Sequence, residues 1–305
     1  MSGAPFVIDA HVHLYDPRVI RYDWMHAQPR LDVPHPPERY WAEAEPAGIG
    51  AAVWVEVNAG EGEYLREARF VADWVARDPR LLGMVASVPS DPAAGRHADV
   101  SGFEALRSVV GVRTLIETRA GDPGWSSSDA FVAEVDRITQ GTDGRRAFDL
   151  CIRAGQLAEV AGLVARRPEV TFVLDHCGKP PIGGNEEKDW RRDLALLAAR
   201  TNCVCKLSGL GTEIVAGEIS AARTRPVLQH ALELFGAERC LFGSDWPICT
   251  LAFPLSDWVE TVREVVAPAG REALDAVFHA TAIQCYGLQL IDTTAQIPRG
   301  GNRDA

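Results

Sequence analysis

Long apolar runs and basic blocks are both missing from this sequence of 305 residues. No stretch approaches the roughly 18 consecutive apolar residues that a membrane-spanning helix needs. Its 31 lysines and arginines are outnumbered by 42 aspartates and glutamates, which gives a formal net charge of −11. A chain this acidic, without a block of lysine and arginine, is a poor partner for nucleic acid or an anionic membrane. These absences argue against both classes and favour a small-molecule substrate.

Paired cysteines and a targeting segment are missing as well. The seven cysteines form neither a CxxC pair nor a dense framework, and most lie in apolar stretches. This usage is typical of buried free thiols in a reducing compartment. The first apparent strand begins by residue 6, which leaves no room for a signal peptide. We therefore expect a cytoplasmic protein.

Eight short apolar runs follow one another along the chain, and each has the character of a β-strand. They begin near Phe6, Ala51, Leu81, Val109, Ala147, Val170, Cys203 and Cys240. From the first start to the last, 234 residues are divided over seven intervals, or about 33 residues each. That interval holds one strand, one helix and two loops. Near-continuous β-branched runs are typical of parallel strands that are covered on both faces.

The segments between these runs change to helical spacing, with apolar residues at i, i+3, i+4 and i+7 and charges elsewhere. Five such stripes lie around residues 64–75, 157–164, 190–197, 227–235 and 258–266. Strand and helix in eightfold alternation predict a (β/α)8 barrel over residues 1–290, followed by a polar tail at 291–305. A doubly wound open sheet is less favoured, because no glycine-rich dinucleotide fingerprint follows the first strand.

A long segment after the first strand departs from the regular spacing. Residues 17–47 contain six prolines and two tryptophans. We expect a stiff, ordered loop, because long loops of this kind usually have a function. Trp24 in this loop is predicted to contact the substrate as part of a lid.

In a barrel, catalytic residues lie where the strands end and the loops begin. The first strand ends in Asp9-Ala-His11-Val-His13. Alternation along an extended chain predicts that Asp9, His11 and His13 share one face, so that both imidazoles reach a common point. Two such histidines suit a divalent metal, or a pair of donors aimed at a carbonyl oxygen. Taken alone, the pair is also compatible with a purely structural role.

Polar residues stand at the ends of other predicted strands too. They are Glu56, Arg113, Asp175 with His176, Lys206 with Ser208, and Ser244 with Asp245. Three histidines and an aspartate, each where a strand opens, indicate a catalytic site more than a set of groups that satisfy loop backbones.

Three segments carry a resemblance to a known family: IDAHVHLYDP (8–17), VLDHCGKP (173–180) and LFGSDWPI (241–248). Together they resemble the amidohydrolase superfamily, in particular the amidohydrolase-related branch that includes lactonases for sugar acids and pyrone dicarboxylate. The resemblance extends over residues 6–288. Position by position, it implies catalytic roles for His11 and His13 of the HxH, His176 after strand 6 and Asp245 after strand 8.

The chain also departs from the pattern of this superfamily. Members with two metals use a lysine or glutamate after strand 4 and a histidine after strand 5. Arg113 and the region of Cys151 and Arg153 occupy those places here. The resemblance therefore implies one divalent ion, zinc before others, or none, and no organic cofactor. The ligands would be His11, His13 and Asp245, with Glu56 as an additional candidate; pairing of Glu56 with a nearby arginine is the alternative.

The expected function is opening of a small lactone, either a sugar-acid 1,4- or 1,5-lactone or a carboxylated lactone. Asp245 would activate water, and His11 and His13 would polarise the carbonyl, directly or through the metal. The side chains expected to hold the substrate are Arg113, Lys206, Trp24, Arg153 and Trp246. A metal-dependent decarboxylase of an aromatic or muconate-like acid is the alternative, and a non-catalytic ligand-binding barrel is a remote one. Assembly into a homo-oligomer stays open.

Overall fold

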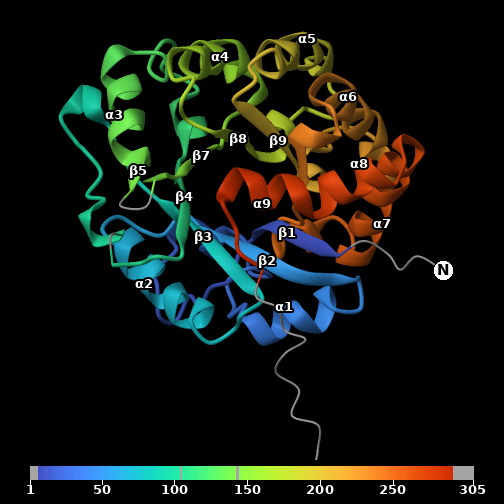
Figure 1. Cartoon of the computed structure of the whole chain (residues 1–305), viewed down its shortest axis with the longest axis horizontal. Coiled ribbons are helices and arrows are strands. Elements are labelled where there is room, and N and C mark those ends of the chain that lie inside the picture. The colour runs from blue at the N-terminus through green and yellow to red at the C-terminus, as the bar shows by residue number, and fades with distance from the viewer. Residues whose placement is uncertain (1–5, 104, 142–143, 291–305) are drawn as a thin grey trace, which may run out of the picture.

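Eight parallel strands follow one another around a barrel, and α-helices lie between most consecutive strands (Figure 1); between the third and fourth strands, the described residues contain only short 3-10 helices. The computed structural model describes residues 6–103, 105–141 and 144–290. The barrel strands are β1 (Val7–Val12), β2 (Ile49–Val55), β3 (Leu81–Ser87), β4 (Val109–Thr114), β7 (Ala147–Leu150), β8 (Phe172–Leu174), β9 (Cys203–Leu207) and β10 (Cys240–Phe242). Each begins within two residues of the start predicted from the sequence, and the predicted (β/α)8 barrel is confirmed.

The barrel closes between its first and last strands. The backbone N–H of Asp245 donates to the carbonyl oxygen of His11 (2.8 Å), and the N–H of His13 donates to the carbonyl oxygen of Trp246 (2.8 Å). Val12 and Trp246 form a parallel bridge at the same point. The sheet is thus nearly closed, and the last contacts are made just after β10. Here the closing contacts also bring the segments that carry His11, His13 and Asp245 side by side.

Most helices form an outer layer with an apolar face toward the strands, and the last of them covers one end of the barrel. They are α1 (Pro37–Ala44), α2 (Tyr64–Val75), α3 (Asp129–Thr139), α4 (Leu157–Arg166), α5 (Glu187–Ala198), α6 (Arg225–Phe235), α7 (Leu255–Val266), α8 (Arg271–Asp275) and α9 (Thr281–Tyr286). The five predicted stripes correspond to α2, α4, α5, α6 and α7 and are confirmed. A two-residue hairpin, β5 (Gln140–Gly141) with β6 (Gly144–Arg145), lies outside the barrel.

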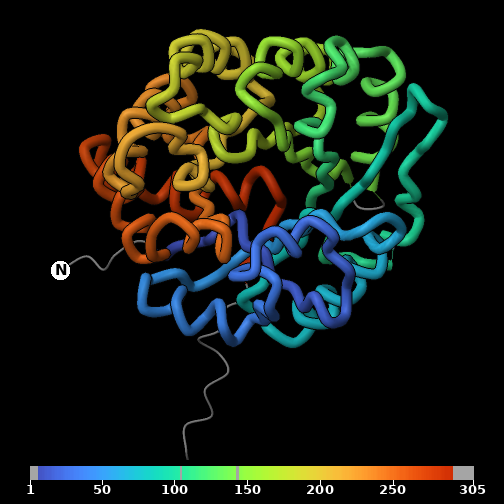
Figure 2. Tube along the Cα trace, turned by 180° about the vertical axis from the view of Figure 1, so that it is seen from behind, coloured from blue at the N-terminus to red at the C-terminus, as the bar shows by residue number. Residues whose placement is uncertain are grey.

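The proline-rich segment after β1 is not a continuous loop as expected. Pro37 begins α1, with Pro36 before it. Proline is tolerated in the first turn of a helix because the N–H that it lacks would have no partner there. Pro36 and Pro37 therefore mark the start of a helix. Seen from the side opposite to Figure 1, the chain between β1 and α1 crosses the far end of the barrel (Figure 2).

The prediction that Asp9, His11 and His13 share one face is wrong. The pairing of β1 with β2 shifts its register between Asp9 and Val12. Such an irregularity changes which side of the sheet the following residues face. Asp9 consequently accepts a hydrogen bond from the hydroxyl of Tyr40 in α1 (2.8 Å). The two histidines face inward at the mouth of the barrel.

The end of the barrel opposite to the histidines is filled by α9 and by Leu288, which lies just after it. Tyr286 and Leu288 belong to the inner apolar cluster, with Ile8, Val53 and Val85 of the strands. A Cβ atom added to Gly111 would lie 3.2 Å from the ring of Tyr286, so glycine leaves room for this plug. Figure 1 shows α9 in front of the barrel, on the side away from the segment between β1 and α1.

Within the described residues, no helix combines the length and apolar character needed to cross a membrane. The predicted polar tail at 291–305 lies outside the described residues. The division of the chain into barrel and tail stays a prediction.

Candidate active site

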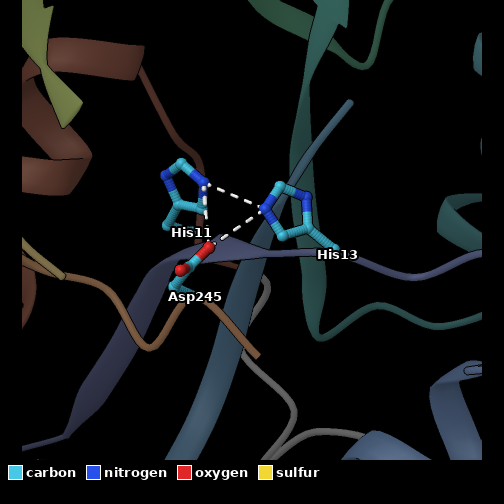
Figure 3. Close-up of side chains that lie close together, drawn as sticks. All are labelled: His11, His13 and Asp245. Carbon is cyan, nitrogen blue, oxygen red and sulfur yellow. Dashed lines mark hydrogen bonds and ion pairs between the residues drawn. The ribbon is translucent and has the colours of Figure 1, made fainter. Parts of the chain in front are cut away.

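His11, His13 and Asp245 meet at the mouth of the barrel (Figure 3). The Nε2 atoms of the two histidines are 3.2 Å apart, and Oδ1 of Asp245 lies 3.1 Å from Nε2 of His13 and 3.7 Å from Nε2 of His11. All three residues are buried. Asp245 has a φ of 63° in the turn after β10, which aims its carboxylate back at the histidines. Three potential ligand atoms therefore face one point.

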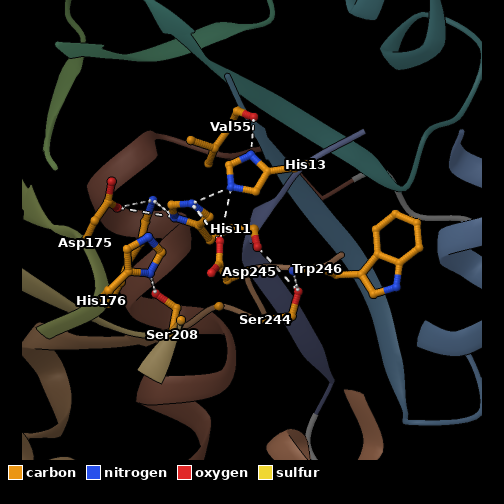
Figure 4. Close-up of polar contacts among 12 residues, drawn as sticks. His11, His13, Val55, Asp175, His176, Ser208, Ser244, Asp245 and Trp246 are labelled. Carbon is orange, nitrogen blue, oxygen red and sulfur yellow. Dashed lines mark hydrogen bonds and ion pairs between the residues drawn. The ribbon is translucent and has the colours of Figure 1, made fainter. Parts of the chain in front are cut away.

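The three atoms fit a divalent ion. Ligands about 2.0–2.1 Å from a tetrahedral zinc lie roughly 3.3 Å from one another, close to the separations found here. Nδ1 of His13 is 3.0 Å from the carbonyl oxygen of Val55, so it donates its proton there and leaves Nε2 with a lone pair (Figure 4). Within the described residues, a second group of suitable atoms comes from His11, Asp175 and His176.

His176 is the third histidine of the site. It lies just after β8, in a turn where both His176 and Cys177 have a φ of 52°. Such backbone strain in non-glycine residues is frequent at functional sites. Nδ1 of His176 is 2.9 Å from Oγ of Ser208, which orients the ring (Figure 4). Burial, opposed by Asp245 and Asp175, lowers the pKa of His176 to about 4, so this imidazole is neutral at physiological pH.

Beneath the histidines, a buried chain of charges crosses the barrel. Nζ of Lys206 lies 2.5 Å from Oδ2 of Asp149, 3.1 Å from Oδ1 of Asp175 and 3.1 Å from Nδ1 of His11. Arg113 continues the chain from Asp175 (3.1 Å) to Glu56 (2.6 Å). All six side chains are at most 5% exposed. Every charged side chain in this buried series has a neighbour of opposite charge, as buried ions require.

These charges determine the protonation of the groups next to the histidines. Burial raises the pKa of Asp175, but Lys206, His11 and Arg113 outweigh it and hold the pKa well below its usual value. Burial lowers the pKa of Lys206, but Asp149 and Asp175 outweigh it and raise the pKa above its usual value. Burial and the positive charge of Lys206 lower the pKa of His11. The site thus holds an ammonium, a carboxylate and a neutral imidazole side by side.

A cavity of about 350 Å³ opens in front of the histidines. Six of the residues predicted for the site line it: His13, Trp24, Glu56, Arg113, His176 and Asp245. Trp24 reaches it from the segment after β1, where its indole N–H donates to the carbonyl oxygen of Val57 (2.9 Å). His11 is fully buried behind His13. A cavity of this size suits a small molecule of sugar dimensions.

Other predicted contacts lie elsewhere. Lys206 is fully buried inside the barrel, and Trp246 packs against Tyr40 with its ring pointing away from the histidines (Figure 4). The side chain of Arg153 is 55% exposed and forms ion pairs at the rim. None of these three lines the cavity. Glu56 lines it but accepts from Arg113, and the candidate metal clusters among the described residues do not include it.

The sequence interpretation missed three charged residues of the cavity wall: Glu117, Lys179 and Glu213. Nζ of Lys179 donates to Oε2 of Glu117 (2.7 Å), and Arg153 approaches the same oxygen (2.9 Å). Lys179 was visible as the lysine of HCGKP, three residues after His176. Glu117 and Glu213 lie in loops without a local signal.

Comparison with known proteins identifies the class to which this barrel and site belong. The family model described as amidohydrolase matches residues 8–288, nearly the whole chain. The chain therefore belongs to the amidohydrolase family, as its three motifs indicated. The family also confirms the expected enzyme class, which sets the non-catalytic barrel aside.

Among individual proteins, the chain is similar to an L-fucono-1,5-lactonase from Burkholderia multivorans, with 29% identity over 92% of this chain and 96% of the relative. It is 24% identical to an L-rhamnono-gamma-lactonase from Scheffersomyces stipitis, over 80% of this chain and 86% of the relative. A crystal structure of an amidohydrolase from Burkholderia multivorans with bound zinc superposes with a TM-score of 0.79 at 26% identity, covering 93% of this chain and 100% of that one.

Proposed function

We propose that the chain hydrolyses the ring ester of a small sugar-acid lactone. The observation that carries the proposal is the placement of the Asp245 carboxylate beside two imidazoles at the head of a cavity of about 350 Å³. This is the donor and base arrangement that ester hydrolysis needs. The relatives named as an L-fucono-1,5-lactonase and an L-rhamnono-gamma-lactonase support the same reaction.

In this proposal, Asp245 takes a proton from the attacking water. The carboxylate lines the cavity, and its Oδ1 lies 3.1 Å from Nε2 of His13. The neutral ring of His176 faces the same cavity and orients the carbonyl oxygen. Asp245 then returns the proton to the departing ring oxygen, so one group serves as base and acid in turn.

His11, His13 and Asp245 are the residues that would hold a divalent ion, and zinc suits their nitrogen and oxygen atoms. Such an ion, when bound, supplies Lewis-acid polarisation of the lactone carbonyl. The solved amidohydrolase with bound zinc supports this choice of metal.

The charges of the cavity favour a sugar lactone over a carboxylated one. The two cations of its wall are already paired, Arg113 with Glu56 and Asp175, and Lys179 with Glu117. Among the described wall residues, no unpaired cation is left for a substrate carboxylate. Carboxylates of the wall, in contrast, are good acceptors for sugar hydroxyl groups. We therefore propose a neutral lactone rich in hydroxyl groups.

We further propose a cytoplasmic location and a role in carbohydrate metabolism. The seven cysteines are free, and six of them are buried. Free thiols are typical of proteins from reducing compartments. The sugar-acid names of the relatives support the metabolic role.

Proton release across a panel of lactones tests the function. The purified protein is offered sugar-acid 1,4- and 1,5-lactones, carboxylated lactones and simple aliphatic lactones, with and without a chelator. Turnover of a sugar-acid lactone, with carboxylated lactones slower by at least about tenfold, is the expected result. Turnover that is lost with chelator and restored by zinc would assign the carbonyl polarisation to the metal.

The decarboxylase alternative makes the opposite prediction. It requires release of CO₂ from an aromatic or muconate-like acid and consumption of a proton. If no lactone is hydrolysed and the metal-loaded protein releases CO₂, the lactonase proposal is overturned.

A further inference from the structure

Lys206 has three neighbours for the three N–H groups of its ammonium. It donates to Oδ2 of Asp149 (2.5 Å) and to Nδ1 of His11 (3.1 Å), and it lies 3.1 Å from Oδ1 of Asp175. The side chain is 0% exposed, so no water competes for these groups. A lysine held in this way has a fixed direction of donation, because an ammonium has no lone pair and cannot accept.

This direction determines which nitrogen of His11 carries the proton. Because Nδ1 accepts from Lys206, the neutral ring has its proton on Nε2. His13 has the opposite arrangement, because its Nδ1 donates to the carbonyl oxygen of Val55 and its Nε2 has the lone pair. The two Nε2 atoms, 3.2 Å apart, then form a complementary donor and acceptor. The result is one directed chain from Lys206 through His11 and His13 to Val55.

A metal ion at the same point needs the other tautomer of His11. A histidine ligand presents its lone pair to the metal and donates from its second nitrogen to an acceptor. Oδ1 of Asp175 lies 3.3 Å from Nδ1 of His11 and, within the described residues, has no hydrogen bond of good geometry. Asp175 is thus the acceptor that the metal-bound tautomer would use, and Lys206 is the donor that opposes it.

We propose that Lys206 is a positioning residue that holds His11 in the Nε2-protonated tautomer and thereby weakens metal binding at His11, His13 and Asp245. The site then has two modes. Without metal, Nε2–H of His11 is donated to Nε2 of His13. With metal, that proton would lie on Nδ1 and be donated to Asp175, and Lys206 would lose one of its two hydrogen bonds while keeping its ion pair with Asp175. Neither mode requires a change in backbone structure. The inference concerns the metal cluster of the proposed function and does not depend on the identity of the substrate.

Metal affinity provides the first test. Replacing Lys206 alone would leave Asp149 without its cation, so the informative protein is the double variant Asp149→Asn/Lys206→Met. Zinc affinity is measured by competition with a chromophoric chelator. We expect the double variant to bind zinc about 10- to 100-fold more tightly than the unmodified protein, the range typical of changes to groups that orient metal ligands.

Asp149→Asn alone is the matched control. It retains Lys206 beside His11, so its zinc affinity should change by less than about threefold. A double variant that binds zinc no more tightly than this control would overturn the proposal. A merely structural role of Lys206 predicts that outcome, because loosened packing weakens a metal site.

The tautomer itself is the second test, and it uses the unmodified protein. Long-range ¹H–¹⁵N NMR of the chelator-treated protein distinguishes imidazoles protonated at Nε2 from those protonated at Nδ1, and His11→Gln assigns the signal. We expect Nε2–H for His11 and Nδ1–H for His13. Protonation of His11 at Nδ1 would overturn the proposal even if the double variant does not fold. Neither measurement uses turnover, so an inactive lactone panel would leave both results interpretable.

Discussion

The backbone N–H of Asp245 donates to the carbonyl oxygen of His11 at 2.8 Å, while Oδ1 of Asp245 approaches Nε2 of the same histidine at 3.7 Å. The contact that closes the barrel and the contact that builds the site therefore join the same two residues. Closure of the sheet fixes the backbone of both groups before any substrate arrives. Such preorganisation is what an efficient active site requires.

Replacement of Asp245 by asparagine should remove the base without disturbing the fold. Asparagine tolerates the left-handed conformation that residue 245 adopts, so the turn keeps its shape. We expect kcat for the best lactone to fall by about 10²–10⁴-fold. The thermal midpoint should stay close to that of the unmodified protein. Activity within a few-fold of normal would remove Asp245 from its proposed role.

Gly209→Ala tests the position of His176. An added Cβ would lie 2.3 Å from Nδ1 of His176, at a residue whose φ is 62°. The ring must move and lose its contact with Ser208. We expect kcat/KM to fall by more than about tenfold, with a loss of roughly 1–2 kcal/mol in the free energy of unfolding.

Gly48→Ala is the matched control for this variant. Gly48 has a φ of 85°, and an added Cβ meets nothing within 4 Å. It should reduce stability by about 1 kcal/mol and leave kcat/KM unchanged. Equal losses of activity in the two variants would show that backbone strain, rather than displacement of His176, is responsible.

Tyr40→Phe should destabilise the seam between β1 and β10. The hydroxyl of Tyr40 donates to Oδ2 of Asp9, and burial already raises the pKa of that carboxyl. Without this donor, a buried oxygen loses its partner, at a cost of about 1–3 kcal/mol in urea unfolding. Tyr15→Phe, which removes a hydrogen bond to the carbonyl oxygen of Leu31, should cost less. A larger loss in Tyr15→Phe would contradict the importance of Asp9.

His35 should make the fold sensitive to acid. Burial, opposed by a hydrogen bond to Val33, lowers the pKa of His35 to about 4. The unfolded chain has a histidine pKa of about 6.5, so it binds this proton first as the pH falls. A depressed histidine pKa contributes stability that is present above about pH 6.5 and is lost as the pH falls toward about 4.

His35→Gln removes this titration. Urea unfolding of both proteins between about pH 7 and pH 4.5 should show that the unmodified protein loses on the order of 2 kcal/mol more than the variant. Comparing the two proteins cancels the opposite contribution of Glu67, whose pKa burial raises to about 8. Parallel stability curves would show that His35 titrates normally.

Local patterns were enough to predict most of the fold and which side chains lie together at the centre of the candidate site, while the roles of these side chains stay predictions. The eight strands are continuous apolar runs, and His11, His13, His176 and Asp245 stand in short motifs at strand ends, where the barrel brings them together. The prediction of a shared face for Asp9 failed because a register shift in β1 depends on its pairing with β2, which the sequence of β1 alone does not contain.

The depth of a side chain within the barrel was also beyond the reach of the sequence. Lys206 is only one residue from the end of β9, yet its ammonium lies inside the barrel among carboxylates of two other strand segments. Glu117 and Glu213 reach the cavity from loops whose course is determined by tertiary packing. The positions of Lys206, Glu117 and Glu213 all depend on contacts with residues far away in the sequence.

The plug formed by α9 has a consequence for how the enzyme is made. The hydroxyl of Tyr286 donates to Asp149, the carboxylate that pairs with Lys206. During synthesis, Tyr286 leaves the ribosome only after all the strands of the barrel. Until then, the ion pair of Asp149 with Lys206 lacks the hydroxyl of Tyr286, and the end of the barrel that α9 covers has no plug. A chain truncated before α9 would therefore lack the hydroxyl that donates to Asp149 and the apolar side chains that fill this end of the barrel, and we expect it to be less stable.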